Sequence, residues 1–215
     1  MKNLFLTMTA GFILFTSCSK DESFEQIEEQ SSDSVYVLKQ SNGTSAWENS
    51  STYNINTYKT HTVVPDNYAH TNGNFISSNR DLTRITWTGT EANNRTSGSA
   101  EVQMTTPISN LHFIMETECV RIDGNEAVYG GIITEVIERS GNAPPIDVNW
   151  RFYFKVIDTE SSRNEIYDKI SNNRILASPR SISLCNIPVT DPFWSTQGYE
   201  EVRNRGYVEV SRNHN

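Results

Sequence analysis

The sequence predicts an all-β protein, an antiparallel sandwich or barrel of roughly seven to nine strands that follows a disordered N-terminal tether. From Val35 onward, apolar and polar side chains alternate in short runs, which is typical of strands with one buried face. Clusters of Gly, Pro, Asn, Asp and Ser separate these runs. No apolar pattern of helical period is long enough to predict a helix. We therefore expect a single β domain over residues 35–215.

The first 17 residues are typical of a secretory signal peptide. Lys2 is the only charge before Lys20, and an apolar run extends from Leu4 to Phe15. A positive start followed by about 7–15 apolar residues is removed on export and is too short for a stable membrane span. The alternative, a buried N-terminal helix, would need a polar face, and this segment has none.

Residues 15–18, Phe-Thr-Ser-Cys, resemble the bacterial lipobox, which implies that Cys18 is acylated with palmitate-type chains and begins the mature protein. Two or three acyl chains hold a protein stably on a membrane. Residues 17–22 are similar to the start of Bacteroidetes lipoproteins. In these, a run such as Lys20, Asp21 and Glu22 directs export to the outer face of the outer membrane. We expect a cell-surface lipoprotein whose lipid anchor makes the membrane a partner.

Residues 18–34 are predicted to form a lipidated acidic tether. Residues 19–34 carry six acidic side chains and one lysine, a net charge of −5 within the −8 of the whole chain. Only Phe24 and Ile27 are large and apolar, too few to bury a core, so the segment should stay extended. A short helix over Phe24–Gln30 is the alternative.

The acidic chain lacks basic clusters, which argues against a nucleic-acid partner.

The clearest strand pattern covers Val148–Val156, where five large apolar residues share one parity. The opposite parity, which we expect near water, holds Asn149, Arg151, Tyr153 and Lys155. Ala100–Met104 alternates in the same way. Further strands are predicted at Tyr36–Leu38, Thr83–Trp87, Ser181–Leu184 and Gly206–Val210. Loops are predicted at Gly89–Ser97, Ser140–Pro145, Thr159–Arg174 and Asn186–Asn204. The strand register within residues 35–80 is not readable.

Two long runs, Leu111–Ile122 and Ala127–Glu138, flank the residues Asp-Gly-Asn-Glu at 123–126. Glycine supplies the positive φ of a tight turn, so these runs predict a β-hairpin. The adjacent Gly130 and Gly131 predict a bulge or a close approach of another chain segment.

Residues 118–132 are similar to a segment in a broad group of uncharacterised secreted bacterial β proteins. The shared pattern is a cysteine, then Gly-Asn-x-Ala, then glycine, here Cys119, residues 124–127 and Gly130-Gly131. Later in that group come an Asp, a second Asp before Ile-Ser, and a second Cys; Asp158, Asp168 and Cys185 fit this order. The resemblance covers residues 80–211 and implies a small β domain without an established activity.

With Cys18 acylated, Cys119 and Cys185 remain as an even pair in a compartment that oxidises thiols, which suggests a disulfide. Two buried free thiols are the alternative, because cysteine is often a core residue.

Asp158, Glu160 and Asp168 bracket a polar loop whose oxygen ligands would suit calcium, although the spacing is not that of an EF-hand. The alternative is that these acids are solvated or cap the loop backbone. No other cofactor is predicted.

We predict no catalytic residue, since no catalytic motif occurs. Of the four histidines, His61, His70, His112 and His214, only His112 lies on a predicted strand, where Glu116 and Glu118 share its parity. A solvated face explains this pattern, whereas a deep pocket lined by these three would indicate an enzyme of unrecognised type.

Phe193, Trp194 and Tyr199 lie in the predicted loop Asn186–Asn204. Exposed aromatic rings bind sugars and peptides, so these residues are the candidate ligand site for a glycan or protein partner. The alternative is a lid in which Phe193 and Trp194 close one end of the core. The sequence thus predicts a binding or structural lipoprotein, with a carbohydrate- or peptide-binding accessory lipoprotein of the outer membrane as the alternative.

Overall fold

The computed structural model describes residues 34–41, 44–50, 68–77, 82–93, 95–159, 167–202 and 206–212. These residues form an antiparallel sheet of twelve strands, which confirms the all-β prediction. The strands are β1 (Val35–Ser41), β2 (Thr44–Asn49), β3 (Tyr68–Ile76), β4 (Leu82–Ala92), β5 (Arg95–Thr106), β6 (Ser109–Asp123), β7 (Glu126–Gly141), β8 (Arg151–Ile157), β9 (Lys169–Ser171), β10 (Ile175–Ala177), β11 (Tyr199–Glu201) and β12 (Tyr207–Arg212). The predicted signal peptide, Cys18, the export run at 20–22 and the tether up to residue 33 lie outside the described residues.

The strand count exceeds the roughly seven to nine predicted, for two reasons. Three strands, β9, β10 and β11, are only three residues long and have no readable alternation of their own. Two more, β2 and β3, lie within residues 35–80, where polar residues hide the register, whereas β1 contains the strand predicted at Tyr36–Leu38.

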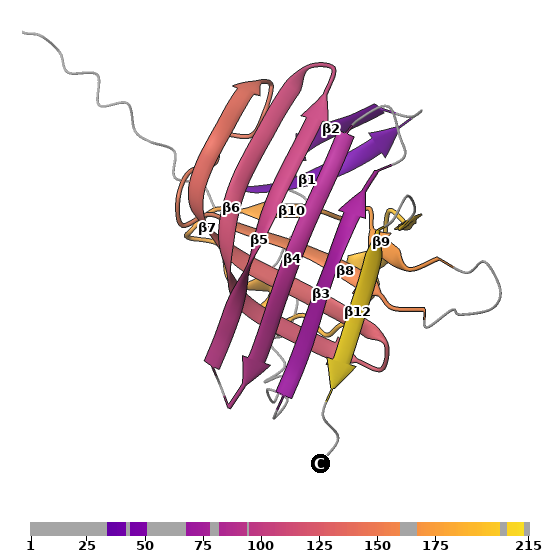
Figure 1. The fold of residues 1–215 in the computed structure, drawn as a ribbon. Helices are drawn as coiled ribbons and strands as arrows, with labels where there is room; N and C mark the ends of the chain where they lie inside the picture. The colour runs from indigo at the N-terminus through magenta and orange to yellow at the C-terminus, as the bar shows by residue number, and fades with distance from the viewer. Residues whose placement is uncertain are drawn as a thin grey trace, which may run out of the picture. The chain divides into compact units, whose positions relative to one another are not determined.

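The main path of the sheet runs in the order β12-β3-β4-β5-β6-β7-β8-β10-β1-β2, and β9 pairs with both β8 and β11. Figure 1 shows β12, β3, β4 and β5 side by side, with β8 and β10 crossing behind them. The core lies between these two groups of strands. Trp87 of β4 meets Phe154 of β8 edge to face at 5.2 Å, and Phe113 of β6 meets Phe152 of β8 at 5.4 Å.

The long hairpin of β6 and β7 belongs to both groups of strands. The first half of β6 pairs with β5, while the first half of β7 pairs with β8. The predicted tight turn is confirmed: Asp123 pairs with Glu126, and Gly124 has a φ of 59°. Three register shifts interrupt the β6–β7 ladder, and such shifts bend a strand pair and increase its twist.

The predicted irregularity at the two glycines is also confirmed. Thr117 pairs with Gly131 and Cys119 pairs with Gly130, so Glu118 is an extra residue in β6. A Cβ atom on Gly130 would lie 2.6 Å from the Tyr153 ring and 2.9 Å from the Cys119 Sγ atom. The glycine therefore allows the tyrosine ring and the cysteine to pack directly over the backbone of β7.

The predicted exposure of the second face of β8 is wrong. Tyr153 and Lys155 are buried, as are their neighbours Phe152 and Phe154 on the other face. The segment 184–194 covers this face and forms a second core with the strands, which is composed of Val35, Val37, Cys119, Val128, Tyr153, Ile175, Ala177, Leu184, Cys185, Ile187, Val189, Phe193 and Trp194. Alternation alone does not distinguish a strand that distant segments cover on both faces from a strand with one exposed face.

Five predicted elements, two strands and three loops, are corrected. The strand expected at Val148 begins at Arg151, because Asn149 adopts a φ of 69° in a turn. The strand predicted at Ser181–Leu184 is absent: Ser183 caps the 3-10 turn η2 (Leu184–Asn186). The loop predicted at Gly89–Ser97 is mostly strand, since β4 and β5 stay paired as far as Ala92 and Arg95. The loops predicted at Thr159–Arg174 and Asn186–Asn204 contain β9, and η3 (Pro192–Ser195) with β11, respectively.

Candidate functional site

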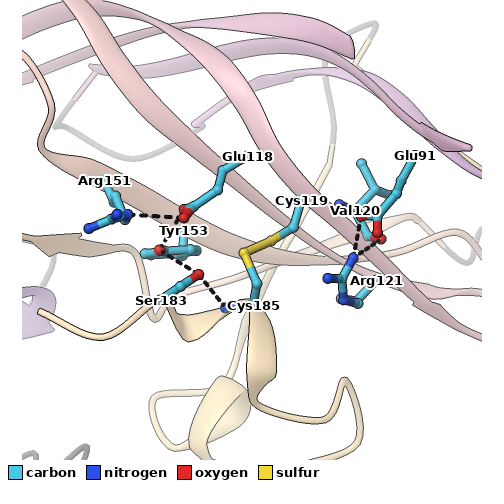
Figure 2. The surroundings of a disulfide bond; sticks show 9 residues. All are labelled: Glu91, Glu118, Cys119, Val120, Arg121, Arg151, Tyr153, Ser183 and Cys185. Carbon is cyan, nitrogen blue, oxygen red and sulfur yellow. Dashed lines mark hydrogen bonds and ion pairs between the residues drawn. A yellow bond between two sulfur atoms is a disulfide. The ribbon is translucent and has the colours of Figure 1, made fainter. Parts of the chain in front are cut away.

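A disulfide joins Cys119 of β6 to Cys185 of η2, as predicted (Figure 2). Their Cα atoms are 6.1 Å apart and the bond closes a sequence separation of 66 residues. Both cysteines are buried in the second core, so the bridge fastens the covering segment to the hairpin.

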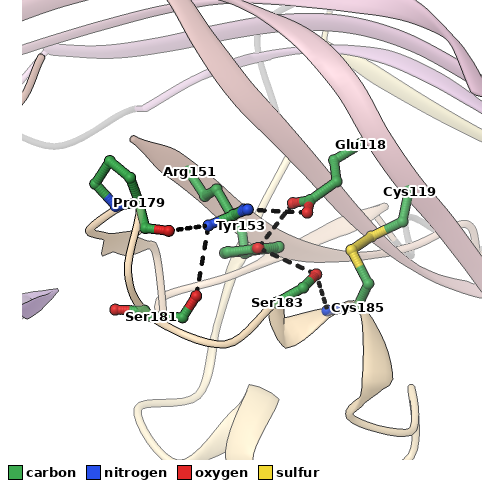
Figure 3. Close-up of polar contacts among 8 residues, drawn as sticks. All are labelled: Glu118, Cys119, Arg151, Tyr153, Pro179, Ser181, Ser183 and Cys185. Atoms are coloured by element: carbon green, nitrogen blue, oxygen red, sulfur yellow. Dashed lines mark hydrogen bonds and ion pairs between the residues drawn. A yellow bond between two sulfur atoms is a disulfide. The ribbon is translucent and has the colours of Figure 1, made fainter. Parts of the chain in front are cut away.

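A polar cluster lies beside the disulfide (Figure 3). The Glu118 carboxylate accepts hydrogen bonds from Tyr153 Oη at 2.8 Å and from Arg151 Nε at 3.0 Å. Arg151 also donates through Nη1 to the carbonyl oxygens of Pro179, at 3.1 Å, and Ser181, at 3.4 Å. These bonds hold the backbone of residues 179–181, just before the covering segment, against β6 and β8.

Burial raises the pKa of the Tyr153 hydroxyl well above its ordinary value, and the nearby Glu118 charge raises it further. The hydroxyl therefore stays protonated and acts as a hydrogen-bond donor. The bulge that makes Glu118 an extra residue in β6 is what brings its carboxylate to this cluster. The cluster stabilises the fold, because its groups form hydrogen bonds with one another and with the backbone carbonyl groups of Pro179 and Ser181.

A second buried ion pair lies on the other side of the disulfide (Figure 2). The Glu91 side chain is almost fully buried, pairs with Arg121 and accepts a hydrogen bond from the Val120 backbone at 3.1 Å. Glu91 was not predicted as a buried residue because it falls in the predicted loop Gly89–Ser97. The signal that could have found it is its position: Glu91 continues the alternation of Thr83–Trp87 on the side that is buried.

The predicted calcium ligands are not assembled as a metal site in the described residues. Asp168 accepts hydrogen bonds from Thr159 N at 3.0 Å and from Val208 N at 2.9 Å, while Asp158 accepts one from Val210 N at 3.1 Å. The bond from Thr159 caps the loop backbone, as in the alternative, while the bonds from Val208 and Val210 cover the edge of β12 that faces away from β3. Glu160 lies outside the described residues, among which no group of three His, Cys, Asp or Glu is placed to hold a metal ion.

The predicted aromatic ligand site is corrected. Phe193 and Trp194 are buried in the second core and meet each other edge to face at 5.0 Å. They form the lid that was the alternative prediction, because the covering segment supplies its own apolar packing. Tyr199 is half-buried on β11, with the Lys155 ammonium 5.9 Å from its ring.

The residues considered for an acid–base site are not brought together. His112 hydrogen-bonds Glu101 of the neighbouring strand at 2.8 Å, Glu116 is exposed, and Glu118 belongs to the cluster beside the disulfide. His61 and His214 lie outside the described residues. His70 has a different setting, in which its Nδ1 atom meets Thr90 Oγ1 at 2.9 Å and its Nε2 atom meets Asn72 Nδ2 at 3.0 Å.

An open groove of about 660 Å³ lies on the outer face of β12, β3, β4 and β5, and we call it the sheet groove. Trp87 and Ala100 lie beneath its surface and are buried. The other lining residues are Asn72, Thr86, Thr88, Ser99, Glu101, Tyr207 and Glu209. Tyr207, with 52% of its surface exposed, is the aromatic ring that the protein presents there. The sheet groove is therefore the candidate ligand site in place of the predicted loop.

The register of four strands brings these side chains together. Tyr207, Asn74, Thr86 and Glu101 are successive cross-strand partners, and the next row holds Glu209, Asn72, Thr88 and Ser99. The predicted strand Gly206–Val210 includes two of these residues, and its alternation places them on one face. Thr86 and Glu101 also lie on predicted strands. That these strands become neighbours in this register was not predictable, because β3, which joins β12 to β4, lies in the polar segment before residue 80.

Comparisons with family models, with curated proteins and with solved structures each found no match. None of the helical segments in the described ranges has the length and apolar character needed to cross a membrane.

Proposed function

We propose that this chain is a lipid-anchored protein of the outer membrane, displayed at the cell surface, whose β domain binds a ligand in the sheet groove. The observation that carries the binding role is the groove itself, where the side chains of four strands converge beside an exposed tyrosine. Binding sites combine a concave surface with a few placed polar groups and an aromatic contact.

The anchor and the location are supported by the N-terminal sequence. The lipobox-like residues end at Cys18, and the run at 20–22 has the acidic character of a surface-export signal. The Cys119–Cys185 disulfide fits export to an oxidising compartment. An acidic tether of residues 18–34 would hold the domain away from the membrane and leave the groove accessible.

The sheet groove favours binding over hydrolysis by paired carboxylates. Glu101 lies on β5 and Glu209 on β12, with β3 and β4 between them. The Glu209 carboxylate bonds Asn72 of β3 and the Glu101 carboxylate bonds His112 of β6, and these two strands are three spacings, about 14 Å, apart. Glycoside hydrolysis by two carboxylates needs them about 5–9.5 Å apart.

The test uses intact cells that express the full chain. Substituting Cys18→Ala should abolish palmitate labelling and reduce labelling by an impermeant reagent, because the anchor is lost. Thr88→Trp should fill the groove and abolish binding of fluorescent oligosaccharides and peptides while surface labelling stays at the wild-type level. Thr134→Trp is the matched control, since Thr134 is an exposed threonine on β7 outside the groove. Equal ligand binding by the Thr88→Trp and Thr134→Trp variants would refute a binding role for the groove.

A further inference from the structure

We propose that the ligand of the sheet groove is an uncharged oligosaccharide, which lies across β12, β3, β4 and β5 with one sugar ring against Tyr207. This inference rests on the proposed binding function and names the chemical class of its ligand.

The charge of the lining disfavours anionic ligands. The groove presents the carboxylates of Glu101 and Glu209, and the described residues that line it include no lysine or arginine. Phosphate, sulfate and uronate groups are recognised by the fork of arginine or the ammonium of lysine. Anionic glycans and phosphorylated ligands would instead be repelled by these carboxylates.

The lining also disfavours an apolar ligand. Its apolar members, Trp87 and Ala100, are each only 3% exposed, so they offer almost no apolar contact surface. Hydroxyl, amide and carboxylate groups make up the rest of the lining apart from the Tyr207 ring. A sugar matches this combination, because its hydroxyl groups both donate and accept hydrogen bonds while its C–H face packs on an aromatic ring.

The polar groups are held in place before a ligand arrives. The Nδ2 atom of Asn72 bonds His70 and, at 2.9 Å, Glu209. Neither bond uses the Asn72 carbonyl oxygen. Glu101 is held by His112 at 2.8 Å. Side chains already held by neighbours lose little conformational entropy on binding.

The edge strand that carries the tyrosine is held as well. The carboxylates of Asp168 and Asp158 accept the backbone N–H groups of Val208 and Val210. Tyr207 and Glu209 alternate with these two residues, so their side chains project into the groove from a fixed strand. The two acids are thus positioning residues for the groove.

The dimensions favour a chain of sugars over a single small cation. The distance from β12 to β5 is three strand spacings, about 14 Å. The Glu209 carboxylate bonds Asn72 of β3 and the Glu101 carboxylate bonds His112 of β6, so β4 and β5 lie between these partners and one ammonium group cannot contact both carboxylates. The groups between them, Asn72, Thr86 and Thr88, are uncharged and follow the line that an extended oligosaccharide would take.

The test uses the purified full chain in a zwitterionic detergent without a sugar headgroup, so that the detergent does not compete. Binding is measured by calorimetry for gluco-, manno-, galacto- and xylo-oligosaccharides, with oligogalacturonate as the anionic probe and tetralysine as the cationic probe. We expect at least one uncharged oligosaccharide to bind and oligogalacturonate not to bind. Tyr207→Ala should weaken that binding about tenfold, whereas Tyr207→Phe keeps the ring and the affinity. Tyr167→Ala, which removes an exposed tyrosine outside the groove, should leave binding unchanged.

The outcomes separate this inference from the proposed function. If only tetralysine binds, and binds less after Tyr207→Ala or Glu209→Gln, the groove is a binding site but the oligosaccharide inference is overturned. Oligosaccharide binding that survives both Tyr207→Ala and Thr88→Trp would place the sugar elsewhere and also overturn it. If no probe depends on the groove residues, the inference and the proposed function both fail. Thermal unfolding midpoints of the variants, expected to equal that of the wild type, show that each exposed substitution leaves the fold intact.

Discussion

Removing the disulfide tests how the covering segment is held on the sheet. The change is the double substitution Cys119→Ala and Cys185→Ala, which leaves no free thiol. The bond closes a loop of 66 residues, and the chain-entropy relation gives about 4 kcal/mol for a loop of that length. Most of this free energy comes from restricting the unfolded chain, so the slope of unfolding against denaturant should rise in the variant.

The native covering segment should remain in place in this variant. Both cysteines pack in the second core, and Arg151 and Tyr153 keep their contacts with residues 179–183. We therefore expect a folded protein with faster amide exchange in residues 179–189, because one of several fastenings is gone.

The assay is guanidinium unfolding of the full chain followed by tryptophan fluorescence, with and without reductant. The wild type should lose about 4 kcal/mol when reductant is added, whereas the double variant should not respond. Non-reducing mass spectrometry provides the control for the oxidised state. Two alkylatable thiols at Cys119 and Cys185 in exported protein, or equal stability of variant and wild type, would refute the reasoning.

Three further predictions concern stability. Gly130→Ala places a Cβ atom 2.6 Å from the Tyr153 ring and should cost about 1–3 kcal/mol in urea unfolding; an unchanged midpoint would contradict the close packing. Glu200→Gln removes the carboxylate 3.1 Å from the fully buried Arg174 guanidinium and should cost about 3–5 kcal/mol. Replacing both partners with apolar residues should cost less than this single change, and a larger loss in the double variant would count against the argument. Burial raises the pKa of the Tyr129 and Tyr153 hydroxyls above their ordinary value of about 10. Their full contribution to the free energy of unfolding is therefore present below about pH 10 and is lost as the pH rises toward the folded-state pKa values. Each of these two tyrosines should contribute a slope of about 1.4 kcal/mol per pH unit in urea unfolding, and Tyr153→Phe should reduce the slope by one tyrosine's share; an unchanged slope would contradict the reasoning.

The sequence by itself determined the class of the fold and its local landmarks. Alternation with a period of two is a property of adjacent residues, so the strand nature of Ala100–Met104 and of the β6–β7 hairpin was predictable. The turn at Gly124 was predictable because it depends on one residue's own conformational freedom. The Cys119–Cys185 bridge followed from an even count of cysteines and the expected compartment.

Only the tertiary structure decided which faces are covered and where side chains from distant strands meet. Burial of Tyr153 and of Trp194 depends on the covering segment, which packs against β8, and no local sequence pattern predicts this contact. The sheet groove combines Asn72 with Tyr207, which are 135 positions apart in the sequence and come together only through the β3–β12 register. The physical reason is that alternation specifies two faces for each strand, whereas the neighbours of a face are chosen by the packing of the whole sheet.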